Sequence, residues 1–187
     1  MELLKKHLST FLPHSQMEEL LAIGKRKKLQ PGDYFIRAGE TPKKLAFVHT
    51  GLFRYVYINE KGVEFTKGII SASGFISSYS AMISKTASHF YIEALEHSEI
   101  FEFNQLPWNH LRDQNPFWDR FLFKIIEKGF CVKEKRERDF LLLNAETRYR
   151  NFLVEFPNLE GRIKQHIIAS YLGIQPESLS RIRKKLT

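Results

Sequence analysis

The 187-residue sequence contains a single cysteine, Cys131, and no long apolar run. One cysteine excludes an internal disulfide and any zinc or iron–sulfur site that is built on several cysteines. No apolar stretch approaches the roughly 20 residues that a membrane-spanning helix needs. The opening Met1–Lys6 lacks the apolar core and the cleavage site of a signal peptide. These absences predict a cytoplasmic protein without a membrane segment.

Motifs for catalysis are also scarce. The seven histidines show no paired metal-ligand spacing, and the sequence contains neither a phosphate-cradling glycine loop nor a nucleophile motif. An enzyme on a cupin-like roll would need histidines and a carboxylate clustered around a metal. We therefore expect no catalytic residues, no metal and no cofactor.

Positive charge is present in excess, and it is unevenly distributed. The chain carries a formal net charge of +8, and residues 144–187 hold eight Lys and Arg against four Asp and Glu. The last quarter of the chain thus holds half of the excess. Basic charge alone is weak evidence for a nucleic-acid partner, but charge that lies beside a recognisable motif is stronger evidence.

Short strand patterns occupy most of the chain between the turn at Pro31-Gly32-Asp33 and residue 103, after a segment to about residue 30 that is typical of short helices. The strand-like segments are rich in β-branched and aromatic residues and are separated by glycines and polar turns. They are Tyr34–Ile36, Leu45–His49, Phe53–Ile58, Val63–Ile70, Phe90–Leu95 and Glu99–Phe103. Many short strands at regular spacing favour a barrel or a double-sheet roll.

A long helix is predicted from Asn115-Pro116 to about Leu143. Asn is a good N-cap and Pro a good first helical residue. Apolar residues fall on more than one face of this helix. One face would pack on its own domain and the other on a second copy, which predicts a homodimer. The alternative is a single amphipathic helix that is buried wholly in its own chain.

The last part of the chain reads as three helices. Asn144 is a possible cap, an apolar stripe runs from Tyr149 to Phe156, and Pro157 ends that helix. In the closing "IASYLGIQPESLSRIRKKL", Gly173 falls where a left-handed residue ends one helix, and Pro176 can begin the next. On the final helix, Leu179, Ile182 and Leu186 line the side that we expect to be buried.

The opposite side of the final helix is polar and basic. At about 100° per residue it collects Glu177, Ser180, Arg181 and Lys184, with Ser178 and Lys185 on one flank and Arg183 on the other. This is the expected build of a helix-turn-helix reader in the major groove, where Arg bonds guanine and Glu accepts from cytosine. An ordinary amphipathic surface helix is the competing interpretation.

This closing stretch resembles the helix-turn-helix of the Crp/Fnr family of bacterial transcription regulators. The order of strands, long helix and small helical domain is similar too. The resemblance implies an α+β protein with three parts. These are a jelly-roll (double-stranded β-helix) domain of cyclic-nucleotide-binding type over residues 1–115, a dimerisation helix over 116–143, and a helix-turn-helix domain over 144–187. It implies double-stranded DNA as a partner and raises RNA polymerase as a second one. We expect no β-hairpin wing after the last helix.

The recognition-helix pattern of the family, Arg-Glu-x-x-x-Arg, is matched only in part. Glu177 and Arg181 occupy the last two positions, whereas Pro176, which has no donor, occupies the first. The resemblance therefore implies an operator that differs from the one best known in the family.

The sensor half departs further from the family. The family cassette places a Glu on a ribose hydroxyl and an Arg on the cyclic phosphate, and these positions fall here on Ser78 and Ser88. A buried phosphate without a cation is costly, so cyclic AMP is not expected to bind in the usual mode. Lys85 or His89 could substitute for the cation. The effector, if one exists, would meet a pocket made of Phe75, Ile76, Ser78, Tyr79, Ser88 and His89.

The sequence thus predicts a dimeric, sequence-specific DNA-binding regulator. The alternative is a ligand-binding sensor module whose helical tail docks a protein partner. The two hypotheses differ in whether the protein has salt-dependent affinity for DNA.

Overall fold

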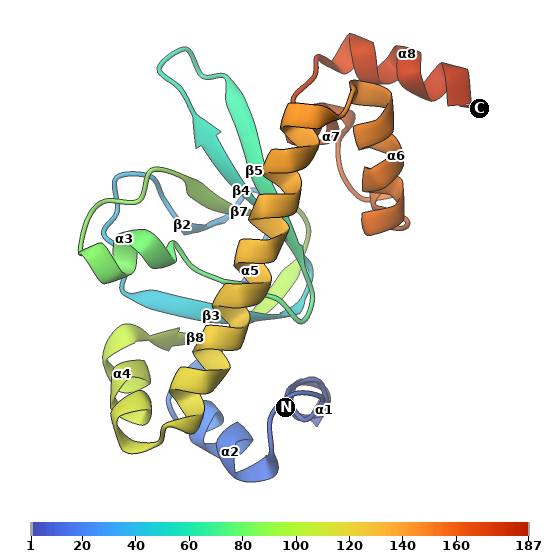
Figure 1. The fold of residues 1–187 in the computed structure, drawn as a ribbon. Helices are drawn as coiled ribbons and strands as arrows, with labels where there is room; N and C mark the ends of the chain where they lie inside the picture. The colour runs from blue at the N-terminus through green and yellow to red at the C-terminus, as the bar shows by residue number, and fades with distance from the viewer. Residues whose placement is uncertain (1, 187) are drawn as a thin grey trace.

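The computed structural model describes residues 2–186, and its strands form two four-stranded antiparallel sheets (Figure 1). The strand order is β1-β8-β3-β6 in one sheet and β2-β7-β4-β5 in the other. The predicted double-sheet roll is therefore confirmed. The strands are β1 Gly24–Leu29, β2 Tyr34–Ile36, β3 Lys44–Thr50, β4 Leu52–Ile58, β5 Glu64–Ser71, β6 Phe75–Ile76, β7 Tyr91–Ala94 and β8 Ser98–Asn104.

Four elements differ from the expectation. Gly24–Leu29, which we expected to end a helical region, is strand β1 and pairs with β8 along its whole length. Its sequence GKRKKL carries almost no apolar signal, so the pairing with β8, rather than local pattern, makes it a strand. Strand β6 and the helices α3 (Tyr79–Ser84) and α4 (Gln105–Gln114) were also not predicted. Only two residues of β6 pair, which is too short for a periodic signal.

The helices at the base of the roll join its first sheet to the start of the long helix. Helices α1 (Glu2–Leu8) and α2 (His14–Ala22) bury Leu4, Leu8 and Leu20 in one apolar cluster with Trp108 of α4 and Trp118 of α5. Trp118 Nε1 also donates a hydrogen bond of 2.7 Å to a carboxylate oxygen of Glu19 on α2. The N-terminal half of the long helix is thereby fixed to its own roll.

The long helix, α5, runs over Phe117–Leu142 and has the two apolar faces that the sequence predicts. The Asn115 side-chain oxygen accepts from the Phe117 amide at 3.0 Å, and Pro116 already has helical φ and ψ. On the inner face Trp118 and Leu122 are buried. Apolar residues spaced by three and four remain exposed on the other face: Phe123 at 61%, Ile126 at 41% and Phe130 at 64%.

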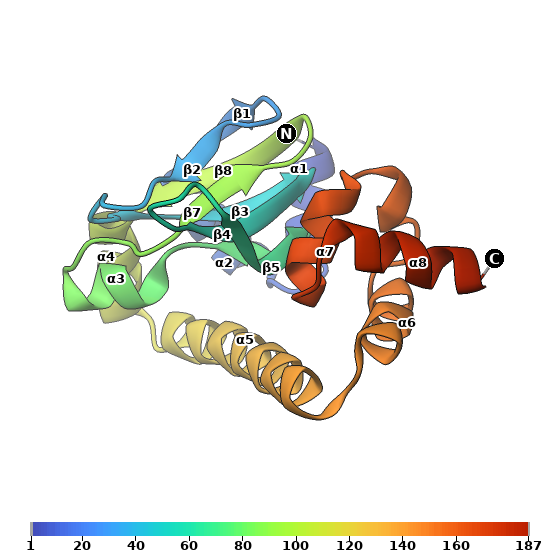
Figure 2. The ribbon, with the colours of Figure 1, turned by 90° about the horizontal axis from the view of Figure 1, so that it is seen from above.

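Beyond α5 lies a small helical domain, called the C-terminal domain below, at the end of the molecule away from α3 and α4 (Figure 2). Its elements are α6 Ala145–Glu155, the 3-10 turn η1 Leu159–Gly161, α7 Gln165–Leu172 and α8 Pro176–Leu186. The predicted cap is confirmed, because the Asn144 side chain accepts from the Thr147 amide at 2.9 Å.

Gly173 makes the turn between α7 and α8. It has the predicted left-handed conformation, with φ of +66°. An added Cβ would lie 2.5 Å from the ring of Phe140 on α5, so a larger residue would be excluded by space as well as by backbone geometry.

Candidate nucleic-acid interface and sensor pocket

Helix α8 has one buried and one exposed side. Leu179 is fully buried, and Ile182 and Leu186 pack against the same apolar cluster as the buried residues of α6 and α7. The predicted site residues lie on the rest of the surface of the helix: Glu177, Arg181, Arg183, Lys184 and Lys185 are exposed, and Ser178 and Ser180 are half-buried. The structure therefore brings these side chains together on one helix and leaves the charged ones open to solvent.

Three of these side chains have partners within the C-terminal domain. Lys185 Nζ lies 2.8 Å from a carboxylate oxygen of Glu146, and Arg183 Nε lies 3.4 Å from Glu160. Arg181 Nη2 donates to the Ser178 hydroxyl at 3.3 Å. The hydrogen bonds from Lys185 and then Arg150 lower the pKa of Glu146. Arg183 and Lys185 are thus tied toward α6 and η1, while Arg181 is bonded only to a neighbour on its own helix among the hydrogen bonds of residues 2–186.

Ser78 and Ser88, where the resemblance places Glu and Arg, meet each other inside the roll. Their side-chain oxygens lie 2.9 Å apart, and Ser88 Oγ lies 2.8 Å from the carbonyl oxygen of Phe90. Both residues are buried, with Ser78 at 0% and Ser88 at 2% exposure. Two mutually bonded hydroxyls satisfy each other and carry no charge, so this position offers no cation to a phosphate.

The other residues of the expected pocket are dispersed. Ile76 belongs to the apolar cluster inside the roll, whereas Phe75 and Tyr79 pack on the cluster shared with α1 and α5. The ring of Phe75 lies 5.6 Å from that of Phe121 on α5. Lys85 and His89, the two proposed substitutes for the missing cation, are both exposed. The structure therefore joins only the two serines of this set.

A half-buried lysine on β5, which packs on Phe90, was not predicted. Lys67 Nζ lies 3.9 Å from the ring centroid of Phe90 and 5.6 Å from that of Tyr57. Burial, and then the charge of Lys133 on α5, lower the pKa of Lys67 to about 8. The sequence feature that could have indicated this residue is the lone Lys in the apolar strand sequence VEFTKGII. Its direction could not be read from the sequence because a β-bulge changes the alternation of β5 at this residue.

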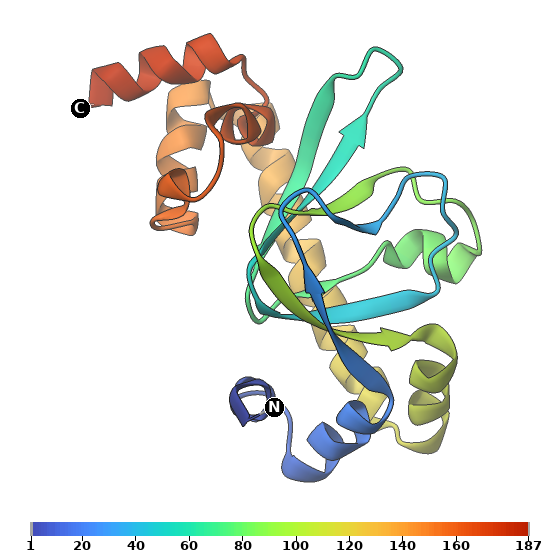
Figure 3. The same cartoon turned by 180° about the vertical axis from the view of Figure 1, so that it is seen from behind.

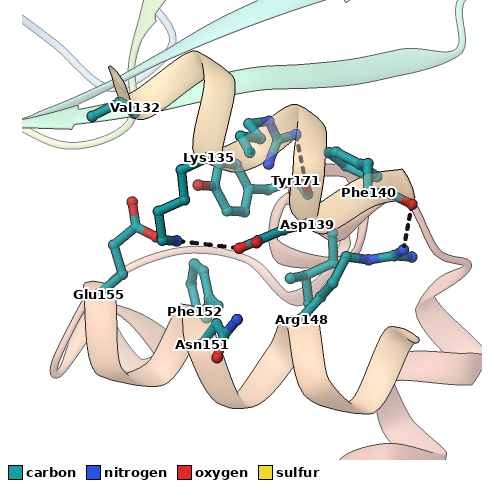
Figure 4. Close-up of a pocket in the computed structure, with 11 residues that line it drawn as sticks. Val132, Lys135, Asp139, Phe140, Arg148, Asn151, Phe152, Glu155 and Tyr171 are labelled. Carbon is teal, nitrogen blue, oxygen red and sulfur yellow. Dashed lines mark hydrogen bonds and ion pairs between the residues drawn. The ribbon is translucent and has the colours of Figure 1, made fainter. Parts of the chain in front are cut away.

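A polar junction joins α5, α6 and α7 (Figure 4). Lys135 Nζ lies 3.3 Å from Asp139 and 3.1 Å from Glu155, so it links α5 to α6. Arg148 of α6 donates to the carbonyl oxygen of Leu143 at 2.9 Å. The cavity between these side chains measures ≈ 30 Å³, which is room for one or two waters. The junction is therefore a joint between helices rather than a ligand pocket.

Two negative findings concern the described chain. Among residues 2–186, no cluster of three or more His, Cys, Asp and Glu has the arrangement of a metal site. Within the same range, no helix combines the length and the apolar character that crossing a membrane requires.

The described chain thus combines a double-sheet roll, a long helix with one apolar face uncovered and a terminal helix-turn-helix. Residues 26–115 match the cyclic nucleotide-binding domain family. No curated protein matches the sequence significantly.

Solved structures with this fold are named as bacterial regulators. The c-di-GMP responsive global regulator CLP of Xanthomonas campestris is 17% identical over 93% of this chain and 91% of its own, with a TM-score of 0.77. FixK2 of Bradyrhizobium japonicum is 16% identical over 88% and 84%, with a TM-score of 0.77. A putative transcriptional regulator of the Crp/Fnr family from Eubacterium rectale is 16% identical over 95% and 85%, with a TM-score of 0.74. Residues 26–115 thus match the cyclic nucleotide-binding domain family, and the chain as a whole has the fold of these solved structures.

Proposed function

We propose that the protein is a sequence-specific transcription regulator that binds double-stranded DNA as a homodimer and is not an enzyme. The observation that carries this proposal is the solvent-exposed face of α8. It presents Glu177, Arg181 and Lys184 with no large apolar residue among them, directly after a helix and turn of helix-turn-helix geometry. A polar face of this kind suits base edges and phosphates in the major groove.

Selection of bound duplexes from a random pool, with and without cell metabolites, is the experiment that tests the proposal. A regulator should enrich a two-fold symmetric site with half-sites about one helical turn apart. Its affinity should fall steeply as salt rises, because phosphate contacts release counterions. A sensor module that docks a protein instead would enrich no sequence and show no such salt dependence.

Arg181→Ala is expected to relax base preference at one position of the selected site and to cost about 1–3 kcal/mol of binding free energy. Arg181 is exposed and donates to the neutral hydroxyl of Ser178, so its guanidinium can turn to a guanine edge. Binding to a panel of single-base variants of the site measures the effect. An unchanged base preference would show that the register assigned to α8 is wrong.

Lys185→Ala is the matched control on the same helix. Its ion pair with Glu146 is exposed and therefore worth little, so Lys185 can exchange the carboxylate for a phosphate. The substitution should weaken all duplexes similarly and reduce the salt slope by about one unit.

Cyclic AMP and cyclic GMP are expected not to bind as effectors. Ser78 and Ser88 bond each other in the place of the charged pair, and neither can neutralise a phosphate as an Arg does. Calorimetric titration up to millimolar nucleotide should show no saturable heat. Cyclic di-GMP belongs in the same titration, because the regulator CLP is described as responsive to it. Saturable micromolar binding of cyclic AMP or cyclic GMP, coupled to a change in DNA affinity, would contradict the expectation.

A further inference from the structure

The outer edge of β5 is covered by the helices of the C-terminal domain instead of another strand. β5 is an edge strand of its sheet, and the β4–β5 hairpin extends beside that domain (Figure 3). The Thr66 amide donates to the Ser170 hydroxyl at 2.8 Å, and the Ser170 hydroxyl lies 3.0 Å from the Glu64 carbonyl oxygen. One serine on α7 therefore satisfies two backbone groups of the strand.

Arg136 of α5 completes this contact. Its Nη2 donates to the carbonyl oxygen of Thr66 at 3.0 Å and to that of Tyr171 on α7 at 2.7 Å. The guanidinium carbon lies 4.0 Å from the ring centroid of Tyr171 and 4.5 Å from that of Phe140. Both backbone groups of Thr66 are thus bonded to side chains from outside the sheet.

The chemistry of Arg136 is that of a positioning group. None of the ion pairs among residues 2–186 includes Arg136, and its hydrogen bonds in that range go to neutral carbonyl oxygens. Burial lowers the pKa of Arg136, so the surroundings do not favour its charge. A half-buried cation held in this way joins three elements, namely β5, α5 and α7.

The strand that Arg136 holds is bulged at the next residue. Tyr55 pairs with Gly68 and Val56 with Thr66, so Lys67 is the extra residue. A bulge re-aims the groups beside it and increases the local twist. Lys67 points to Phe90, whose carbonyl oxygen lies beside Ser88. The bulge therefore lies between the apolar cluster inside the roll, to which Phe90 belongs, and the held edge of β5.

We propose that Arg136 and Ser170 form a lock that positions the C-terminal domain on the edge of β5, and that the Lys67 bulge is the place where a change in the roll acts on this lock. A rearrangement of the apolar cluster around Phe90 would shift the bulge through Lys67 and loosen both bonds at Thr66. The orientation of α8 relative to α5 would then change. This inference rests on the proposed function for its regulatory meaning, but the lock itself can be tested without DNA.

Amide hydrogen exchange on the full-length protein tests the lock. Ser170→Ala removes the acceptor of the Thr66 amide, and its exchange is expected to accelerate about tenfold. Arg136→Lys keeps the charge but loses the planar fork, so it should raise exchange at Thr66 and around the α5–α6 connection. Arg138→Lys is the matched control, because Arg138 lies on the same helix with a 63% exposed side chain.

Lys67→Met tests the input to the lock. Replacing the ammonium by an apolar end should change Thr66 exchange severalfold, and the effect should not add to that of Ser170→Ala, because coupled sites are non-additive. If the effects of Lys67→Met and Ser170→Ala on Thr66 exchange were fully additive, the bulge would not act through the lock.

The outcomes separate the lock from the proposed function. The lock would be overturned if the Thr66 amide exchanged at the same rate in Ser170→Ala and Arg136→Lys as in the Arg138→Lys control. If Arg136→Lys does not fold, the result for Ser170→Ala alone decides. The wild type and both variants are also compared for DNA binding. If the wild type binds DNA and both variants keep its preference for half-site spacing, the lock does not position α8. No sequence-specific DNA binding by the wild type would refute the proposed function and leave the exchange result standing.

Discussion

Phe130→Glu is expected to make the protein monomeric at micromolar concentration and to weaken binding to its selected site by about a hundredfold or more. The exposed apolar face of α5 is too regular to be scattered surface residues, since Phe123, Ile126 and Phe130 follow the three-and-four spacing of a helix seam. A glutamate on this face would place two like charges close together across a two-fold axis. A monomer binds one half-site and loses the gain in affinity that two linked half-sites provide.

Lys128→Ala is the matched control for this prediction. It changes the net charge by the same single unit and lies on the same helix, but away from Phe123, Ile126 and Phe130. Sedimentation equilibrium of both variants and of the wild type, with and without the selected duplex, gives the oligomeric state. A Phe130→Glu dimer as stable as the control dimer would exclude this face of α5 as the interface.

Local sequence patterns were sufficient to predict the ends of helices and the faces that helices bury. Asn115, Asn144 and Gly173 mark the ends of helices because capping and left-handed turns depend on a single residue type. The two faces of α5 and the burial of Leu179 follow from helical periodicity. These predictions were confirmed.

The features that were missed depend on partners far away in the chain. The strand character of Gly24–Leu29 comes from pairing with β8, whose partner residues lie about 70 to 80 positions later. The lock at Thr66 joins residues about 70 and 104 positions apart. The sequence pointed to Lys85 and His89 as substitute cations because they are close to Ser88 in the chain, whereas the half-buried Lys67, which packs on Phe90 from another strand, was missed. Periodicity carries no information about such contacts.

Arg54 is the clearest case of a missed long-range feature, since a lone Arg in the strand FRYVYI gave no sign of burial. Its guanidinium, at 4% exposure, lies 2.7 Å from Glu93 on β7 and 2.7 Å from Glu64 on β5. Burial opposes the charge, but the contacts with Glu64 and Glu93 outweigh it and raise the pKa of Arg54. The ion cluster therefore ties together three neighbouring strands of the sheet that carries the β5 edge.

Arg54→Ala is expected to lower the free energy of unfolding by about 3–5 kcal/mol, because Glu93, whose side chain is only 14% exposed, would lose its cation. Urea unfolding with an unchanged m-value would measure the loss. Arg26→Ala is the control. Arg26 also pairs with a carboxylate, that of Glu99 at 2.6 Å, but its side chain is 40% exposed, so the cost should be about 1 kcal/mol or less. The double variant Arg54→Met/Glu93→Leu removes both charges and should recover most of the lost stability. If Arg54→Ala costs no more than Arg26→Ala, the cluster does not hold these strands together, and the β5 edge must be kept in place by its apolar contacts alone.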